Sequence, residues 1–118
     1  HPLDWPGDAP IKGVTIGGVR GLERLTNAGA ELFLSGHLHF AHARLYGTRA
    51  LCVSSGTLSQ RLRHEPPAFT AIRRPAPNVI EVEVLHVKDA CAESATKRRF
   101  TLASRAVADA PADIHAGA

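Results

Sequence analysis

The alternation of side chains between residues 79 and 87 constrains the fold of this chain more than any other feature. Ile80, Val82 and Val84 fall on one side of an extended backbone, and Glu81 and Glu83 fall on the other. Apolar residues on one side and carboxylates on the other are typical of a half-buried strand. The pattern therefore predicts a β-strand with one buried face.

Helical spacing marks one element in the first third of the chain. Val19, Leu22 and Leu25 recur at intervals that place them on one side of a helix. Gly29 follows where a helix requires its C′ residue. We expect one short helix there, and residues 1–18, which are rich in Pro and Gly, are expected to form a loop that leads into it.

Short apolar runs predict strands on either side of the middle of the chain. Residues 31–35 suit a buried strand, and residues 42–46 and 49–54 suit a hairpin. Its two-residue loop would be Gly47-Thr48, in a type II′ turn. Residues 68–73 are expected to add a short strand.

The end of the chain is polar, with little apolar material to pack. Residues 99–103 are expected to pair beside the alternating strand, across a polar loop over residues 88–98. The Ala-, Asp- and Gly-rich residues 104–118 are predicted to be a disordered tail. The domain is accordingly expected to cover residues 1–103.

Composition sets the class of protein. The 118 residues are 44% hydrophobic and 21% charged, which fits one globular domain and no membrane segment. Cys52 and Cys91 are widely separated, so neither a disulfide framework nor a zinc knuckle is expected, and a reducing cytoplasm fits best. The lack of methionine and the start at His1 indicate a piece of a longer protein.

Two histidines follow the strand expected at residues 31–35. In extended backbone, side chains two residues apart leave on the same side, so His37 and His39 are expected to reach one metal cluster while Leu38 points into the core. Gly36 allows a sharp exit from the strand. Imidazole is a good ligand for Zn²⁺, Fe, Mn²⁺ or Ni²⁺, but two imidazoles cannot close a site. A plain surface or core role for both histidines is the alternative.

The order of helix, glycine turn, apolar strand, Ser35-Gly36-His37-Leu38-His39, hairpin and Ser55-Gly56-Thr57 resembles the last block of the calcineurin-like metallophosphoesterases. The resemblance implies an α/β fold, namely the C-terminal portion of a four-layer αββα sandwich, mostly β-strands with one short helix. It also implies that His37 and His39 each bind one ion of a dinuclear centre, made of Mn, Fe, Zn or Ni. Such a centre hydrolyses phosphate monoesters or diesters.

The same resemblance leaves much of the family's site unaccounted for. The earlier Asp-x-His, Gly-Asp and Gly-Asn-His blocks have no match here. The partner that completes the domain would be the missing N-terminal half, and the isolated chain is expected to be inactive. His1-Pro2 resembles the end of a His-His-Pro run whose ligand is usually the first His, so His1 is not assigned as a ligand.

Other candidates have plainer interpretations. His42 is taken as a substrate contact or third ligand, with an ordinary hairpin residue as the alternative. Arg61 and Arg63 suit a phosphate oxygen, but with Glu65 they also suit a solvated loop. Residues 55–57 suit an anion, but also a turn.

Two other classes of protein stay open. One is a small β-rich module that binds a single Zn²⁺ or no metal. The other is a basic nucleic-acid binder, suggested by the net charge of +3, although only 5% of the residues are aromatic and no stacking platform is evident. For a phosphoesterase, nucleic acid would enter only as a substrate.

Overall fold

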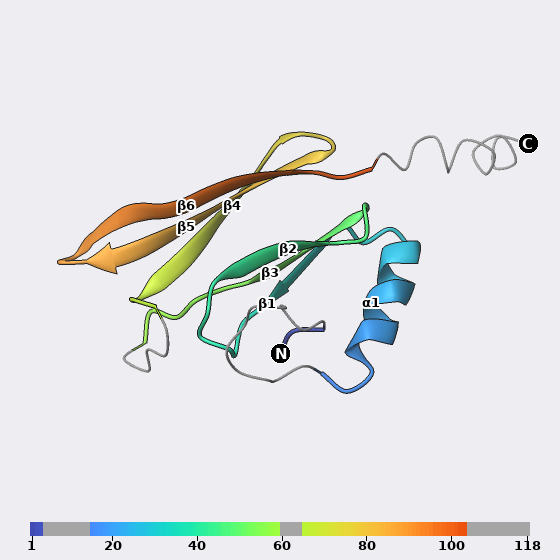
Figure 1. Ribbon diagram of the computed structural model, residues 1–118, viewed down its shortest axis with the longest axis horizontal. Helices are drawn as coiled ribbons and strands as arrows, with labels where there is room; N and C mark the ends of the chain where they lie inside the picture. Colours follow the sequence, from blue (N-terminus) through green and yellow to red (C-terminus); the bar gives the residue numbers. More distant parts are fainter. Residues whose placement is uncertain (4–14, 60–64, 104–118) are drawn as a thin grey trace, which may run out of the picture.

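A computed structural model describes residues 1–3, 15–59 and 65–103. These residues form one helix and six strands in two three-stranded sheets (Figure 1). The expected tail at residues 104–118 lies outside the described residues. The elements are α1 (Gly18–Asn27), β1 (Leu32–Ser35), β2 (His42–Tyr46), β3 (Ala50–Ser54), β4 (Ala68–Ala76), β5 (Val79–Lys88) and β6 (Cys91–Thr101).

Helix α1 confirms the expected element but buries a different stripe. Leu22 is fully buried, whereas Val19 and Leu25 are about half exposed. The buried positions are Gly18, Leu22 and Thr26, which recur every four residues. Gly18 lies directly beneath the carbonyl of Leu3, where a Cβ would clash, so a glycine is needed for the N-terminal residues to cross the helix.

The first sheet, sheet A, has the order β1-β3-β2. β1 runs parallel to β3, and β2 pairs antiparallel with β3. The hairpin expected between β2 and β3 is confirmed, but its loop is wrong by one residue. Tyr46 pairs with Ala50, so Gly47, Thr48 and Arg49 form the turn, and Gly47 has a positive φ of 60°.

The second sheet, sheet B, is an antiparallel meander of order β4-β5-β6. Its central strand is the alternating segment, and Ile80 and Val82 are buried as expected. The polar loop expected over residues 88–98 is wrong. The chain turns at Asp89 and Ala90, both with positive φ, and β6 pairs with β5 along its length.

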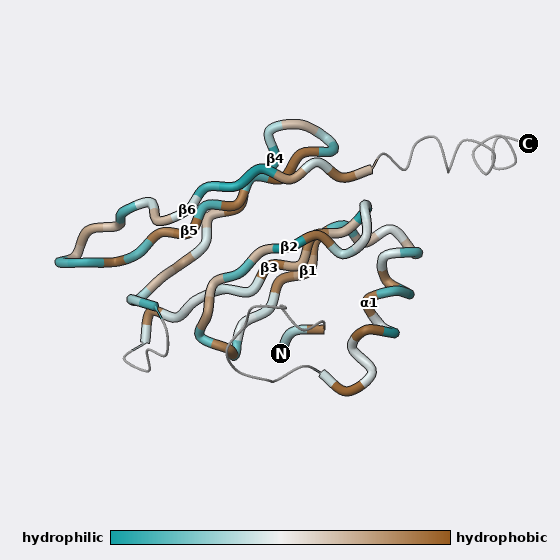
Figure 2. Tube along the Cα trace, in the orientation of Figure 1, coloured by the Kyte–Doolittle hydropathy of each residue, from teal (hydrophilic) through white to brown (hydrophobic). Residues whose placement is uncertain are grey.

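The core lies between the two sheets. Figure 2 shows hydrophobic stretches in β1 and β3 and hydrophilic stretches in α1 and sheet B. In Figure 1, sheet B lies above sheet A, while α1 lies to the right of sheet A and the N-terminus lies below it. The buried core cluster consists of Ala43, Leu51, Val53, Ile80, Val82, Phe100 and Leu102.

A backbone hydrogen bond joins the two sheets where β6 ends, and a second holds the end of β6 to the β4–β5 turn within sheet B. The amide of Ala103 donates to the carbonyl of Thr48 at 2.6 Å, and the amide of Leu102 donates to the carbonyl of Asn78 at 2.7 Å. Within residues 1–3, 15–59 and 65–103, no helix has the length and apolar character needed to cross a membrane.

Candidate functional site

The candidate site is the loop that joins β1 to β2, at the carboxyl end of β1. This is where the apolar run predicted it. The amide of Ser55, just past the end of β3, donates to the carbonyl of Ser35 at 2.9 Å. The parallel strands β1 and β3 therefore end together, and open α/β sheets place their sites at such ends.

The backbone at the two histidines is not extended. His37 has a φ of 73° and His39 a φ of 56°, both in the left-handed region. The amide of Leu38 donates to the carbonyl of Gly36 at 2.9 Å, which closes a tight turn. The expectation that extended backbone aligns the imidazoles is wrong. Their assignment as ligands rests on the resemblance alone and stays a prediction.

Leu38 anchors this turn in the protein interior. Its side chain is only 2% exposed, which confirms that it points inward, whereas His37 is exposed and His39 is partly buried. Left-handed φ is unusual outside glycine and is seen more often for His than for most residues. Such strained backbone concentrates at functional sites.

His1 lies against this loop. Its ring stacks on the ring of His37, with 3.7 Å between centroids and 29° between the ring planes. The N-terminal residues therefore bring a further imidazole to the candidate site. The sequence had left His1 without a role.

Glu65 supports the far end of the same loop. Its Oε1 accepts a hydrogen bond from the amide of Ala41 at 2.7 Å. The same oxygen would lie 2.5 Å from a Cβ added to Gly56, so that glycine makes room for the carboxylate. The interpretation of Glu65 as a solvated loop residue is wrong, and no sequence pattern marks it, because its partner is a backbone amide 24 residues away.

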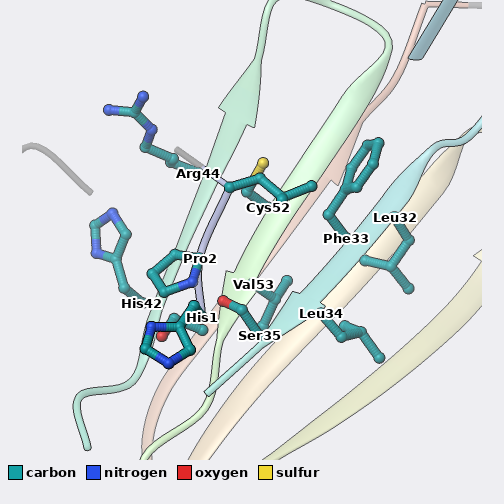
Figure 3. A pocket seen from close by; sticks show the side chains of 12 residues that line it. His1, Pro2, Leu32, Phe33, Leu34, Ser35, His42, Arg44, Cys52 and Val53 are labelled. Carbon is teal, nitrogen blue, oxygen red and sulfur yellow. The ribbon is translucent and has the colours of Figure 1, made fainter. Parts of the chain in front are cut away.

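His42 begins β2 beside a pocket of about 210 Å³ on the outer face of sheet A. The structure thus brings His42 to a cavity together with His1, while neither His37 nor His39 lines it. His42 also stacks on Phe40 at 6.0 Å. In Figure 3 the His42, His1 and Arg44 side chains lie on the left of the pocket, and Phe33 with Leu32 lies on the right.

The described residues do not complete a metal centre. They hold no group of three or more His, Cys, Asp or Glu side chains placed to bind one ion. His37 and His39 are imidazole donors only, and a dinuclear centre also needs carboxylates that bridge its ions. This donor set alone therefore does not fit two metal ions.

The remaining sequence candidates divide between the fold and the residues outside the description. Ser55 uses its amide for Ser35, and the Thr57 hydroxyl accepts from the amide of Ser59 at 3.0 Å, so both serve the turn. Arg61 and Arg63 lie outside the described residues. So do Asp4, Trp5, Asp8, His64 and His115.

The basic clusters are engaged within the molecule. Arg73, Lys97 and Arg99 surround Glu81, and the hydrogen bond from Arg99 lowers the pKa of that carboxyl, with the charge of Lys97 adding to the effect. Arg98 donates to the carbonyl of Ala43 and lies over the ring of Phe100. These contacts give Arg73, Lys97, Arg98 and Arg99 partners within the molecule.

The fold has a counterpart among known structures. The chain is similar to a single mutant of Vps29 from Entamoeba histolytica, with a TM-score of 0.54 and 13% sequence identity. Vps29 has the calcineurin-like metallophosphoesterase fold. This chain has the fold of part of a calcineurin-like metallophosphoesterase.

The likeness to Vps29 covers 80% of this chain and 52% of that one, so the chain spans about half the length of the protein it matches. At this identity the likeness concerns the fold alone. No protein-family model and no curated protein matches the sequence.

Proposed function

We propose that this chain is the C-terminal part of a metal-dependent phosphoesterase, which hydrolyses phosphate monoesters or diesters at a dinuclear centre. The observation that carries the proposal is the loop after β1. It presents His37 and His39 on a strained turn, fixed by the buried Leu38 and by Glu65, in a fold shared with Vps29. The structure shows the loop, and the metals belong to the proposal.

Within this proposal, the chain supplies part of the metal site and not all of its ligands. His37 and His39 would each bind one ion, of Mn, Fe, Zn or Ni, and His42 would contact the phosphate ester substrate. The carboxylate ligands would come from the N-terminal half of the domain. Because two imidazoles cannot hold two ions, the 118-residue chain alone is expected to have no activity.

The expected domain bounds, tail and location belong to the same proposal. Residues 1–103 would be the C-terminal part of the domain, and residues 104–118 a disordered tail. The expected location is a reducing cytoplasm.

Two observations weigh against a single-zinc module and against a nucleic-acid binder, while a β-rich module without metal stays the alternative. A single-zinc module would use His37, His39 and His42, but these do not form a metal-binding group within the described part of the chain. A nucleic-acid binder would present free cations, whereas Arg73, Lys97 and Arg99 contact the carboxylates of β5.

The test uses the longer protein that includes the residues encoded before His1. Its hydrolysis of an aryl phosphodiester with Mn²⁺ is measured for wild type, His37→Ala and His39→Ala, together with the metal content of each. His86→Gln, a change on β5, is the matched control. We expect each loop variant to lose at least 100-fold in activity and part of the bound metal, with the control unchanged.

Two results would reject the proposal. One is a longer protein without metal-dependent turnover. The other is loop variants that keep wild-type activity and metal content. Turnover by the 118-residue chain well above its own His37→Ala variant would show that these residues form a complete site.

A further inference from the structure

We infer that the pocket on the outer face of sheet A binds a small organic anion with a flat apolar body. The pocket measures about 210 Å³, and an apolar cavity of about 150 Å³ is enough for benzene. This inference does not depend on whether His37 and His39 hold metal, because neither residue lines the pocket.

Strand register builds the floor of the pocket. Side chains alternate between the two faces of sheet A. The side chains that point away from the core point into the pocket. Figure 3 shows most of them. They form two cross-strand rows, Phe33–Cys52–Arg44 and Ser35–Ser54–His42.

Ser54 provides the observation that points to a ligand. Ser54 is 4% exposed and lines the pocket, and its hydroxyl forms no hydrogen bond within the described part of the chain. A buried hydroxyl without a partner is destabilising. An acceptor or donor atom of a bound molecule would satisfy it.

The charged and polar lining favours an anion. Arg44 lies in the middle of β2 and lines the pocket, and a guanidinium binds a carboxylate or phosphate through paired hydrogen bonds. His1 and His42 add imidazole nitrogens. Among the described residues that line the pocket, the one charged side chain other than histidine is that of Arg44.

The rest of the lining is apolar and suits a ring. Pro2 is buried, and Leu3, Leu32 and Phe33 complete that wall. An aromatic side chain beside a flat ligand adds stacking or edge contact to the burial of apolar surface. A molecule of one ring that carries one anionic group matches both parts of the pocket.

The experiment titrates the 118-residue chain with benzoate and follows amide chemical shifts by NMR. Benzyl alcohol, which has the ring without the charge, and acetate, which has the charge without the ring, are titrated in parallel. We expect benzoate to bind at least tenfold more tightly than either, with the largest shifts at Phe33, Arg44 and Ser54.

Variants then assign the contacts. Arg44→Gln should weaken benzoate about tenfold or more and change benzyl alcohol less than twofold. Ser54→Ala should weaken benzoate several-fold. Arg44→Lys should retain part of the affinity, and it serves if Arg44→Gln does not fold. Arg20→Gln, on the exposed surface of α1, should leave binding unchanged.

Several results would overturn the inference. Equal affinity for benzyl alcohol would mean a plain apolar cavity, and equal affinity for acetate would mean an adventitious ion only. Absence of binding at about 10 mM benzoate, shifts confined to other faces, or wild-type affinity in folded Arg44→Gln and Arg44→Lys would each reject the site.

Discussion

Replacing Gly56 with alanine should disturb the loop after β1 from a distance. The new Cβ would lie 2.5 Å from Oε1 of Glu65 and 2.9 Å from the Cβ of Ala68. Contacts this short require the carboxylate to move, which removes its 2.7 Å hydrogen bond to the amide of Ala41. Gly56→Ala therefore tests whether Glu65 holds the loop.

The cost has two parts. A hydrogen bond to a charged group contributes about 1.5–3 kcal/mol, and forcing an extra carbon into packed surroundings costs about 1–3 kcal/mol. Because Glu65 is partly exposed and can regain water, we take the lower ends of both ranges. Gly56→Ala should lower the free energy of unfolding by about 2–3 kcal/mol, which lowers Tm by roughly 10 °C.

Gly21→Ala is the matched control. Gly21 lies inside α1, and nothing lies within 4 Å of the position of an added Cβ. The same substitution should there stabilise the protein by about 0.5–1 kcal/mol, because alanine favours the helix. Urea unfolding of both variants gives the two free energies, and the amide shift of Ala41 reports directly on the loop.

A double-mutant cycle with Glu65→Ala isolates the carboxylate. Part of the cost of Gly56→Ala should disappear in the Glu65→Ala background, while the part due to Ala68 remains. The reasoning is refuted if Gly56→Ala unfolds like wild type. It is also refuted if its cost is the same with and without the Glu65 side chain.

Three further predictions concern other parts of the fold. Ala90→Gly should raise the free energy of unfolding by about 1 kcal/mol, because Ala90 has a φ of 62° in the turn before β6. Thermal unfolding measures this, with Ala92→Gly, a change within β6, as the control. The pKa of Glu81 is lowered in the folded state, so the ionised carboxyl stabilises the fold above about pH 4.5, and this stabilisation is lost as pH falls through the folded pKa. In an acid titration of unfolding, Glu81→Gln should therefore lose less stability below about pH 4.5 than wild type. Leu34 is 66% exposed on β1, and β1 pairs only with β3 among the described strands, so Leu34→Lys should reduce self-association in sedimentation velocity, and an unchanged distribution would contradict this.

The sequence could predict the elements whose own side chains reveal their surroundings. β5 shows its buried face through alternation, and the helix shows its end through Gly29, which has a φ of 116°. The end of β6 was expected within residues 99–103, but residues 91–98 gave no such sign, because all of them are exposed. Their strand conformation comes from pairing with β5 and from the turn at Asp89 and Ala90, and neither can be read from apolar spacing.

The site shows the same division between local and distant causes. The loop position followed from the apolar run before Gly36, and the burial of Leu38 from its place between two histidines. The backbone conformation of the loop did not follow, because it depends on tertiary packing. Glu65 and Ser54 were missed for a related reason. Only folding brings Glu65 to the amide of Ala41 and places Ser54 beside His42 in the sheet.

The hydrogen bonds of Leu102 and Ala103 have a consequence for motion. Residues that follow the last strand of a sheet usually fray, and their amides exchange quickly with solvent. Here both amides donate to carbonyls of other segments, one of them in the turn of the opposite sheet, and Leu102 is 2% exposed. The bond of Leu102 lies within sheet B, whereas the bond of Ala103 to Thr48 opens only when the end of β6 separates from sheet A. In deuterium, the amide of Ala103 should therefore exchange at the rate at which this end of sheet B leaves sheet A.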